Sequence, residues 1–66
     1  MNPGDIYTDR GKTNWSVMIA FVEKDIIFST SLKGGVPFRL NKEDFDKYYT
    51  FNQKLTDLYL IKDIIE

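Results

Sequence analysis

The chain has 66 residues, of which 15% are aromatic, and it contains neither cysteine nor histidine. A chain this short buries only about 60% of its unfolded surface and forms one domain; disulfides and thiolate or imidazole metal sites are excluded, and we expect no cofactor. Nine basic and ten acidic residues give a net charge of −1, which excludes a strong overall field for nucleic acid or an anionic membrane.

The N-terminal residues predict a turn followed by a short strand. Residues 1–5 contain Pro3 and Gly4, which favour a bend, and residues 6–8 are β-prone. Residues 9–14 are polar or flexible and predict a hairpin loop to the next strand.

The longest β-type run is residues 15–22. At period 2, Trp15, Val17, Ile19 and Phe21 share one face, which we predict to be the core face. Trp15 is accordingly interpreted as a core anchor, with an exposed stacking platform as the alternative.

Two more strands are predicted. A tight hairpin at residues 23–25 leads into a strand at 26–28, and a longer loop at 29–35 follows. In the strand at 36–40, the apolar positions 36, 38 and 40 are predicted to face inward. Pro37 faces outward and cannot donate to a ladder, which indicates an unpaired edge.

Residues 42–49 predict a short helix with Asn41 as its N-cap. The helix would place Phe45, Tyr48 and Tyr49 on one side, where they would cap the open end of the sheet.

A second segment begins at Asn52. We prefer a helix for residues 53–65, although the run at 58–61 also suits a final strand. Its apolar residues cover more than one stripe, so we expect contacts with two surfaces, one of them belonging to a partner.

Together these elements predict a mainly β chain with a C-terminal helix (α+β), specifically a small SH3-like antiparallel β-barrel of four to five strands. Residues 1–66 form the single domain, and residues 52–66 pack on it or on a partner. We find no signal-peptide or membrane-spanning pattern, expect no membrane partner, and expect a cytoplasmic location.

Enzyme chemistry is the least favoured function, because acid–base work would fall to carboxylates, Lys or Tyr. Glu43, Asp44 and Asp46 are interpreted as acids that complement the helix dipole, with an Mg²⁺ or Ca²⁺ site as the alternative. Gly34 and Gly35 suit a hairpin rather than a phosphate loop, since no Gly-Lys-Ser/Thr sequence leads into a helix.

Protein binding is the preferred function, because a 66-residue domain has little interior for its aromatic rings. The partner could be a second copy, giving a homodimer. The candidate residues are Tyr48, Tyr49, Phe51, Leu58, Tyr59, Ile61 and Ile65. The alternative is that the rings close the barrel.

Weak nucleic-acid binding is the second hypothesis. Loop and outer-face cations combined with rings are typical of small β-barrels that bind single strands. The candidates are Arg10, Lys12, Lys33 and Arg39, with Trp15 or Tyr7 as stacking platforms.

The order Gly4-Asp5-Ile6-Tyr7-Thr8-Asp9-Arg10, then the strands, then Phe45-Asp46-Lys47-Tyr48, resembles small phage and prophage proteins of unknown function over residues 4–49. The segment from Thr50 onward departs from their pattern. The resemblance implies a phage-encoded accessory protein that binds and modulates (inhibits) a host protein, such as a defence enzyme, and it assigns no residue a role.

Overall fold

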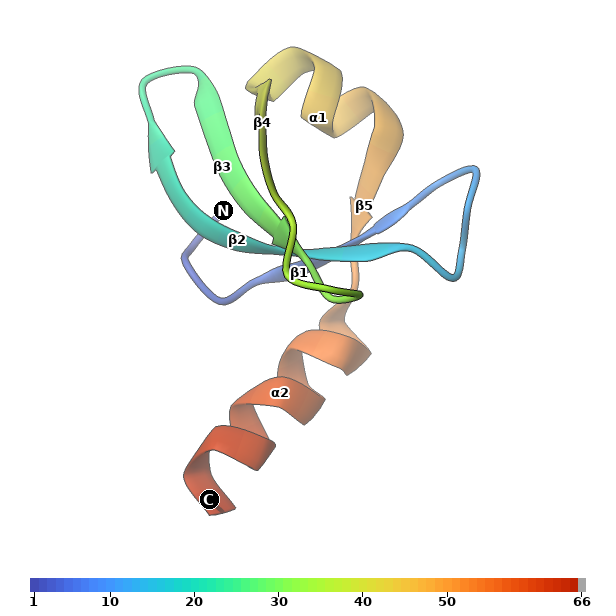
Figure 1. The fold of residues 1–66 in the computed structure, drawn as a ribbon, viewed down its shortest axis with the longest axis vertical. Helices are drawn as coiled ribbons and strands as arrows, with labels where there is room; N and C mark the ends of the chain where they lie inside the picture. Colours follow the sequence, from blue (N-terminus) through green and yellow to red (C-terminus); the bar gives the residue numbers. More distant parts are fainter. Residues whose placement is uncertain (66) are drawn as a thin grey trace.

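The computed structural model describes the backbone of residues 1–65 and the side-chain surroundings of residues 1–60. Its strands are β1 (Ile6–Asp9), β2 (Ser16–Glu23), β3 (Ile26–Ser31), β4 (Pro37–Asn41) and β5 (Tyr49–Phe51). Helix α1 (Lys42–Tyr48) connects β4 to β5, and α2 (Gln53–Ile65) follows β5 (Figure 1). The predicted combination of an antiparallel sheet and a C-terminal helix is confirmed.

The strands form one open antiparallel sheet in the order β4-β3-β2-β1-β5. The strands curve strongly, and α1 lies across one end of the sheet between β4 and β5 (Figure 1). Pro37 begins β4, an edge strand, as predicted from its missing N–H. The sequence predicts Tyr49 as the last residue of the helix and a break at residues 50–52; instead, residues 49–51 pair with β1 as β5.

A β-bulge divides β2 into two parts. Val17 lies opposite Ser31 and Ile19 opposite Ser29, but the next pair is Phe21 with Phe28, which leaves Ala20 as the extra residue. One inserted residue exchanges the two faces of the strand beyond it. Phe21 is therefore 48% exposed, and the prediction that it faces the core is wrong.

β3 is longer than predicted. Ser29 lies opposite Ile19 on one side and Phe38 on the other, so ladder pairing with both neighbours extends the strand through residues 29–31. Val36 precedes β4 and is 57% exposed, so the prediction that it faces inward is wrong. The prediction for Phe38 and Leu40 is confirmed, because both pack against the core.

The core lies between the sheet and α1. Its buried members are Val17, Ile19, Ile27, Phe45 and Tyr49, and Tyr7, Trp15, Phe38 and Leu40 pack against them. The core-side position predicted for Trp15 is thus confirmed.

Helix α1 begins where the sequence predicts. The Asn41 side chain accepts a hydrogen bond from the Asp44 N–H at 2.8 Å, which confirms the N-cap. The Phe45 ring lies 5.1 Å from that of Tyr7 and 4.8 Å from that of Tyr49, centroid to centroid. Tyr48 does not join them: it is 50% exposed, because Phe45 and Tyr49 already fill the inward side.

Candidate protein interface

Helix α2 begins at Asn52, as predicted, and this residue fixes the helix to β1. Its backbone N–H donates to the Ile6 carbonyl at 2.8 Å, and its side-chain amide donates to the Thr8 hydroxyl at 2.9 Å. Its side-chain oxygen accepts from the Leu55 N–H at 2.9 Å, which is an N-cap bond. One side chain therefore caps the helix and joins it to the sheet.

Thr56 continues the pairing that β5 leaves unfinished. β5 ends at Phe51, and beyond that point the Ile6 N–H donates to the Thr56 hydroxyl at 2.8 Å. The Thr56 hydroxyl thus accepts the hydrogen bond from the Ile6 N–H that a backbone carbonyl of a longer β5 would accept. The first turn of α2 is anchored to β1, and Leu55 and Thr56 are half-buried there.

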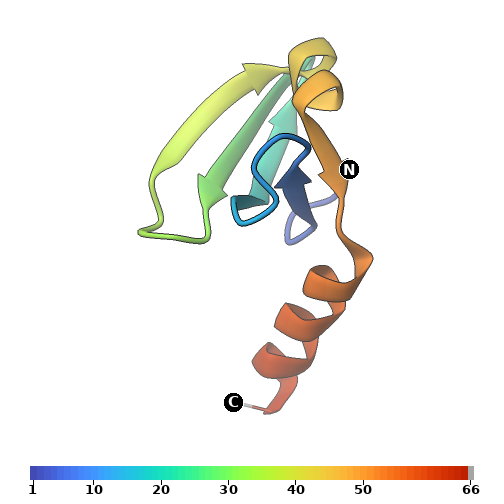
Figure 2. The same cartoon turned by 90° about the vertical axis from the view of Figure 1, so that its right-hand side faces the viewer.

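Beyond this first turn, α2 runs away from the sheet in both views (Figures 1 and 2). Leu58 is 52% exposed and Leu60 is 60% exposed. Asp57 is exposed as well, and it accepts a hydrogen bond from the Gln53 side chain at 2.7 Å. We call Asp57, Leu58 and Leu60 the helix patch; the sequence hypothesis selected Leu58 but not Leu60.

The other predicted interface residues do not form one surface. Tyr59 is half-buried and lines a small hollow with Leu60 and with Pro3, Gly4 and Met18. Phe51 is 42% exposed, and its ring lies edge-on to that of Tyr7. Tyr48 is exposed on α1, with the Lys47 ammonium 5.6 Å from its ring centroid.

Tyr49 is removed from the candidate interface. It is only 8% exposed, and its ring stacks on that of Phe45. Pairing of Tyr49 in β5 with Asp9 in β1 turns the Tyr49 side chain toward the core. The prediction that Tyr49 packs with Phe45 against the sheet is thus confirmed, whereas its choice as an interface residue is wrong. The side chains of Ile61 and Ile65 lie outside the described part of the structure.

A second apolar surface lies on the outer face of the sheet. The bulge at Ala20 brings Phe21 beside Phe28, and their rings stack with centroids 4.4 Å apart. Arg39 lies directly opposite Phe28 on β4, and Pro37 lies opposite Thr30. These residues line a shallow groove of about 300 Å³, which we call the outer-face groove: Ala20, Phe21, Phe28, Thr30, Pro37 and Arg39.

The sequence hypothesis missed this groove because strict alternation assigns Phe21 to the interior. The run of β-type residues at 15–22 contains no glycine or proline to mark the bulge. The available sign of a bulge was the unequal length of the two predicted strands: the run at 15–22 has eight residues, whereas its hairpin partner was predicted at 26–28.

The predicted nucleic-acid candidates are dispersed. The Arg10 guanidinium donates to the main-chain carbonyls of Tyr49 and Asp46, both at 3.3 Å. It therefore satisfies carbonyls at the C-terminal end of α1, where the helix dipole favours a cation. Arg10 thus has a structural role in addition to its predicted place as an exposed loop cation.

The remaining cations lie in two loops and on the outer face of β4. Lys12 lines a hollow in the β1–β2 loop with Trp15, and Lys33 lies exposed in the β3–β4 loop. Arg39 lies on the outer face of β4 instead.

Two tyrosines have raised pKa values. Burial is the main cause of the raised pKa of Tyr7, and the nearby Asp5 and Asp46 carboxylates add to it. Burial likewise raises the pKa of Tyr49, against an opposing hydrogen bond from Trp15. Both phenols stay protonated near neutral pH, which fits packing rather than proton abstraction.

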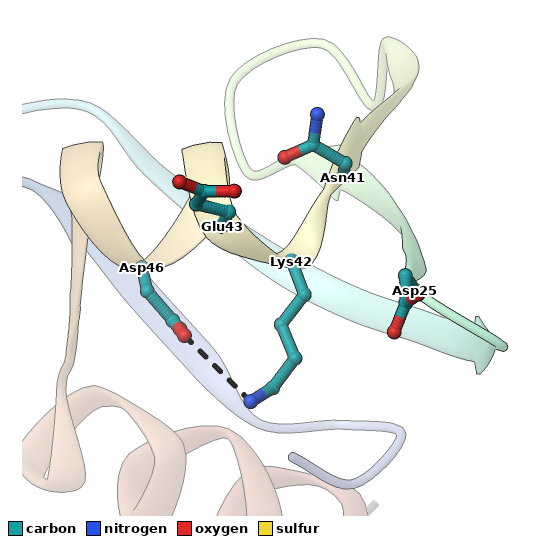
Figure 3. Close-up of a pocket in the computed structure, with 5 residues that line it drawn as sticks. All are labelled: Asp25, Asn41, Lys42, Glu43 and Asp46. Carbon is teal, nitrogen blue, oxygen red and sulfur yellow. Dashed lines mark ion pairs between the residues drawn. The ribbon is translucent and has the colours of Figure 1, made fainter.

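A shallow polar depression lies at the start of α1, lined by Asp25, Asn41, Lys42, Glu43 and Asp46 (Figure 3). The Lys42 ammonium points to the Asp46 carboxylate, 3.8 Å away, whereas Glu43 and Asp25 point elsewhere. Among the described residues, no group of three His, Cys, Asp or Glu side chains could hold a metal ion. This depression does not gather its carboxylates around one point.

Within the described residues, no helix has the length and apolar character needed to cross a membrane. No family model, no curated protein and no solved structure matches this chain, so the candidate interface is defined by its geometry alone.

Proposed function

We propose that this protein is a non-enzymatic protein-binding module that uses α2 as its main contact element. The observation that carries the proposal is the helix patch: α2 is anchored by its first turn, yet Leu58 and Leu60 beyond that turn are more than half exposed. Exposed large apolar side chains held on a projecting element are typical of interaction surfaces.

The energetics support a partner. Fully burying one leucine side chain contributes about 1.5–3 kcal/mol. A helix of 13 residues is marginal by itself in water, and among residues 53–60 only Leu55, Thr56 and Tyr59 are half-buried. A partner that encloses α2 on both flanks would bury Leu58 and Leu60.

We further infer that the strongly curved sheet, with α1 placed between β4 and β5, is a partly open SH3-like barrel. The resemblance of residues 4–49 to small phage and prophage proteins supports a phage-encoded accessory role, in which the module binds and modulates a host protein. A gene position within a phage early region supports that role; a position among housekeeping genes of a cell contradicts it.

The test compares affinity captures by the full chain and by the variant Leu58→Ser/Leu60→Ser. We expect the variant to lose a partner that the unchanged chain retains. Val36→Ser is the matched control, because Val36 is 57% exposed but lies in the β3–β4 loop, away from α2. Equal capture by all three chains would refute α2 as the contact element.

Weak binding of single-stranded nucleic acid is the second candidate, since Lys12 and Trp15 line the same hollow. Binding of a labelled oligonucleotide at low salt that Lys12→Glu abolishes would support it. Because few cations are involved, affinity would already be weak at physiological salt.

A further inference from the structure

Helix α2 covers only part of the outer face of the sheet. Ile6 of β1 is fully buried although it does not belong to the core between the sheet and α1. Its ladder partner Met18 lines the hollow with Thr56 and Tyr59 of α2, so the helix lies over this part of the outer face. Farther along the same face, on β2, β3 and β4, lies the outer-face groove, where Phe21 is 48% exposed.

This uncovered part of the face is apolar, whereas an antiparallel sheet commonly turns polar side chains to water there. Phe21 and Phe28 stack with their ring centroids 4.4 Å apart, and Ile26 follows on the same side of β3. Burial of apolar surface is favourable by about 25 cal/mol per Å². The groove is therefore suited to a second layer that packs on it.

Two opposite charges lie on this face, on either side of the rings. Arg39 lies opposite Phe28 on β4, and Glu23 lies opposite Ile26 at the end of β2. Both side chains are exposed, and neither belongs to the ion pair that the described residues form, which is on α1. Both charges are thus available to another molecule.

We propose that the outer-face groove is a dimer interface, on which a second copy of this chain packs face to face about a two-fold axis. Arg39 and Glu23 are separated by two strand spacings, about 10 Å, and by two residues of rise, about 7 Å. An axis that crosses β3 between Phe28 and Ile26 exchanges their positions. It brings Arg39 of each copy to Glu23 of the other and lays the stacked rings of the two copies together.

The arrangement of charges identifies the occupant as a second copy. In a two-fold dimer every contact occurs twice, so one face that carries both Arg39 and Glu23 supplies both partners of two ion pairs. A carboxylate and a guanidinium form strong charge-assisted hydrogen bonds. The interface does not use Leu58 or Leu60, so this inference goes beyond the proposed function and leaves α2 open to another protein.

Sedimentation velocity and light scattering of the full chain from about 1 μM to about 1 mM test the dimer, with circular dichroism to confirm folding. We expect Arg39→Glu and Glu23→Arg each to weaken dimerisation by about tenfold or more, because each places like charges together at both contacts. An equal mixture of the two variants should restore a heterodimer, since opposite charges then meet at both contacts. Lys47→Glu is the control and should leave the dimer unchanged, because Lys47 is exposed on α1, on the other side of the sheet.

A chain that is still monomeric at about 1 mM overturns this inference. A dimer that neither charge variant weakens, or that their mixture fails to restore, overturns it as well. A dimer that is lost in Leu58→Ser/Leu60→Ser but not in Arg39→Glu would assign self-association to α2 and also overturn it. Capture of another protein through Leu58 and Leu60 remains a separate result, so the proposed function and the outer-face dimer can fail independently.

Discussion

The side-chain amide of Asn52 donates to the hydroxyl of Thr8 at 2.9 Å across 44 residues of sequence. The same Thr8 hydroxyl lies 2.9 Å from that of Ser16, so the cap of α2 connects to β1 and through it to β2. The direction in which α2 leaves the sheet therefore depends on a short polar network.

We predict that Asn52→Ala lowers the free energy of unfolding by about 1–2 kcal/mol, because it removes the N-cap bond and leaves the buried Thr8 hydroxyl with one partner fewer. Urea denaturation measures the change. Lys54→Ala, on the exposed side of the same turn, is the control and should change stability by less than about 0.5 kcal/mol. Equal effects of the two substitutions would contradict the anchoring role of Asn52.

The two buried serines of β3 should respond oppositely to alanine. The Ser29 hydroxyl is buried and makes no hydrogen bond within the described structure, so Ser29→Ala should be neutral or stabilising by up to about 1 kcal/mol. The Ser31 hydroxyl donates to the Lys33 carbonyl at 2.8 Å and accepts from the Val36 N–H at 3.1 Å. Ser31→Ala should cost about 1–2 kcal/mol, measured by thermal unfolding. A clear loss of stability in Ser29→Ala would mean that its hydroxyl has a partner.

Arg10→Met should destabilise the fold by about 0.5–1 kcal/mol, because the carbonyls of Asp46 and Tyr49 lose a charged donor at the end of α1. Added salt should reduce the difference between variant and wild type, since the interaction is partly exposed to solvent. Lys12→Met in the same loop is the comparison and should have little effect on unfolding. If both substitutions destabilise the fold equally, the loss of stability comes from removing a positive charge from the loop and not from losing the hydrogen bonds to the α1 carbonyls.

The tyrosines predict a loss of stability at alkaline pH. Because burial raises the pKa of Tyr7 and Tyr49 above the ordinary value of 10.0, the folded state holds these protons more tightly than the unfolded state. Their contribution is complete below about pH 10 and is lost as pH rises through the folded pKa values. Denaturation at several alkaline pH values, read with phenolate absorbance, measures this. Tyr49→Phe should flatten the decline, whereas Tyr48→Phe, at an exposed position, should not.

Local features of the fold were predictable from sequence. The Asn41 cap and the start of the second segment at Asn52 were predicted correctly, because capping depends on residues within one turn. The edge position of Pro37 followed from its missing N–H, and the core position of Trp15 from period-2 alternation before the bulge.

Features that depend on distant pairing were not predictable. The bulge at Ala20 reversed the face of Phe21, and residues 49–51 became a strand because they pair with β1. Ser29 and Ser31 became strand residues because the neighbours of β3 supply ladder partners. The role of Arg10 likewise depends on carbonyls that lie more than thirty residues away in the chain. The candidate site was accordingly predicted in part: Leu58 was selected, and the outer-face groove was missed.

The bulge in β2 also determines how much apolar surface the sheet exposes on its outer face. Without the bulge, regular alternation would place Ala20 opposite Phe28 and turn Phe21 to the interior side of β2, and the outer side would lose its stacked pair of rings. One irregular position in the ladder between β2 and β3 thus decides whether the outside of the sheet displays a pair of aromatic rings.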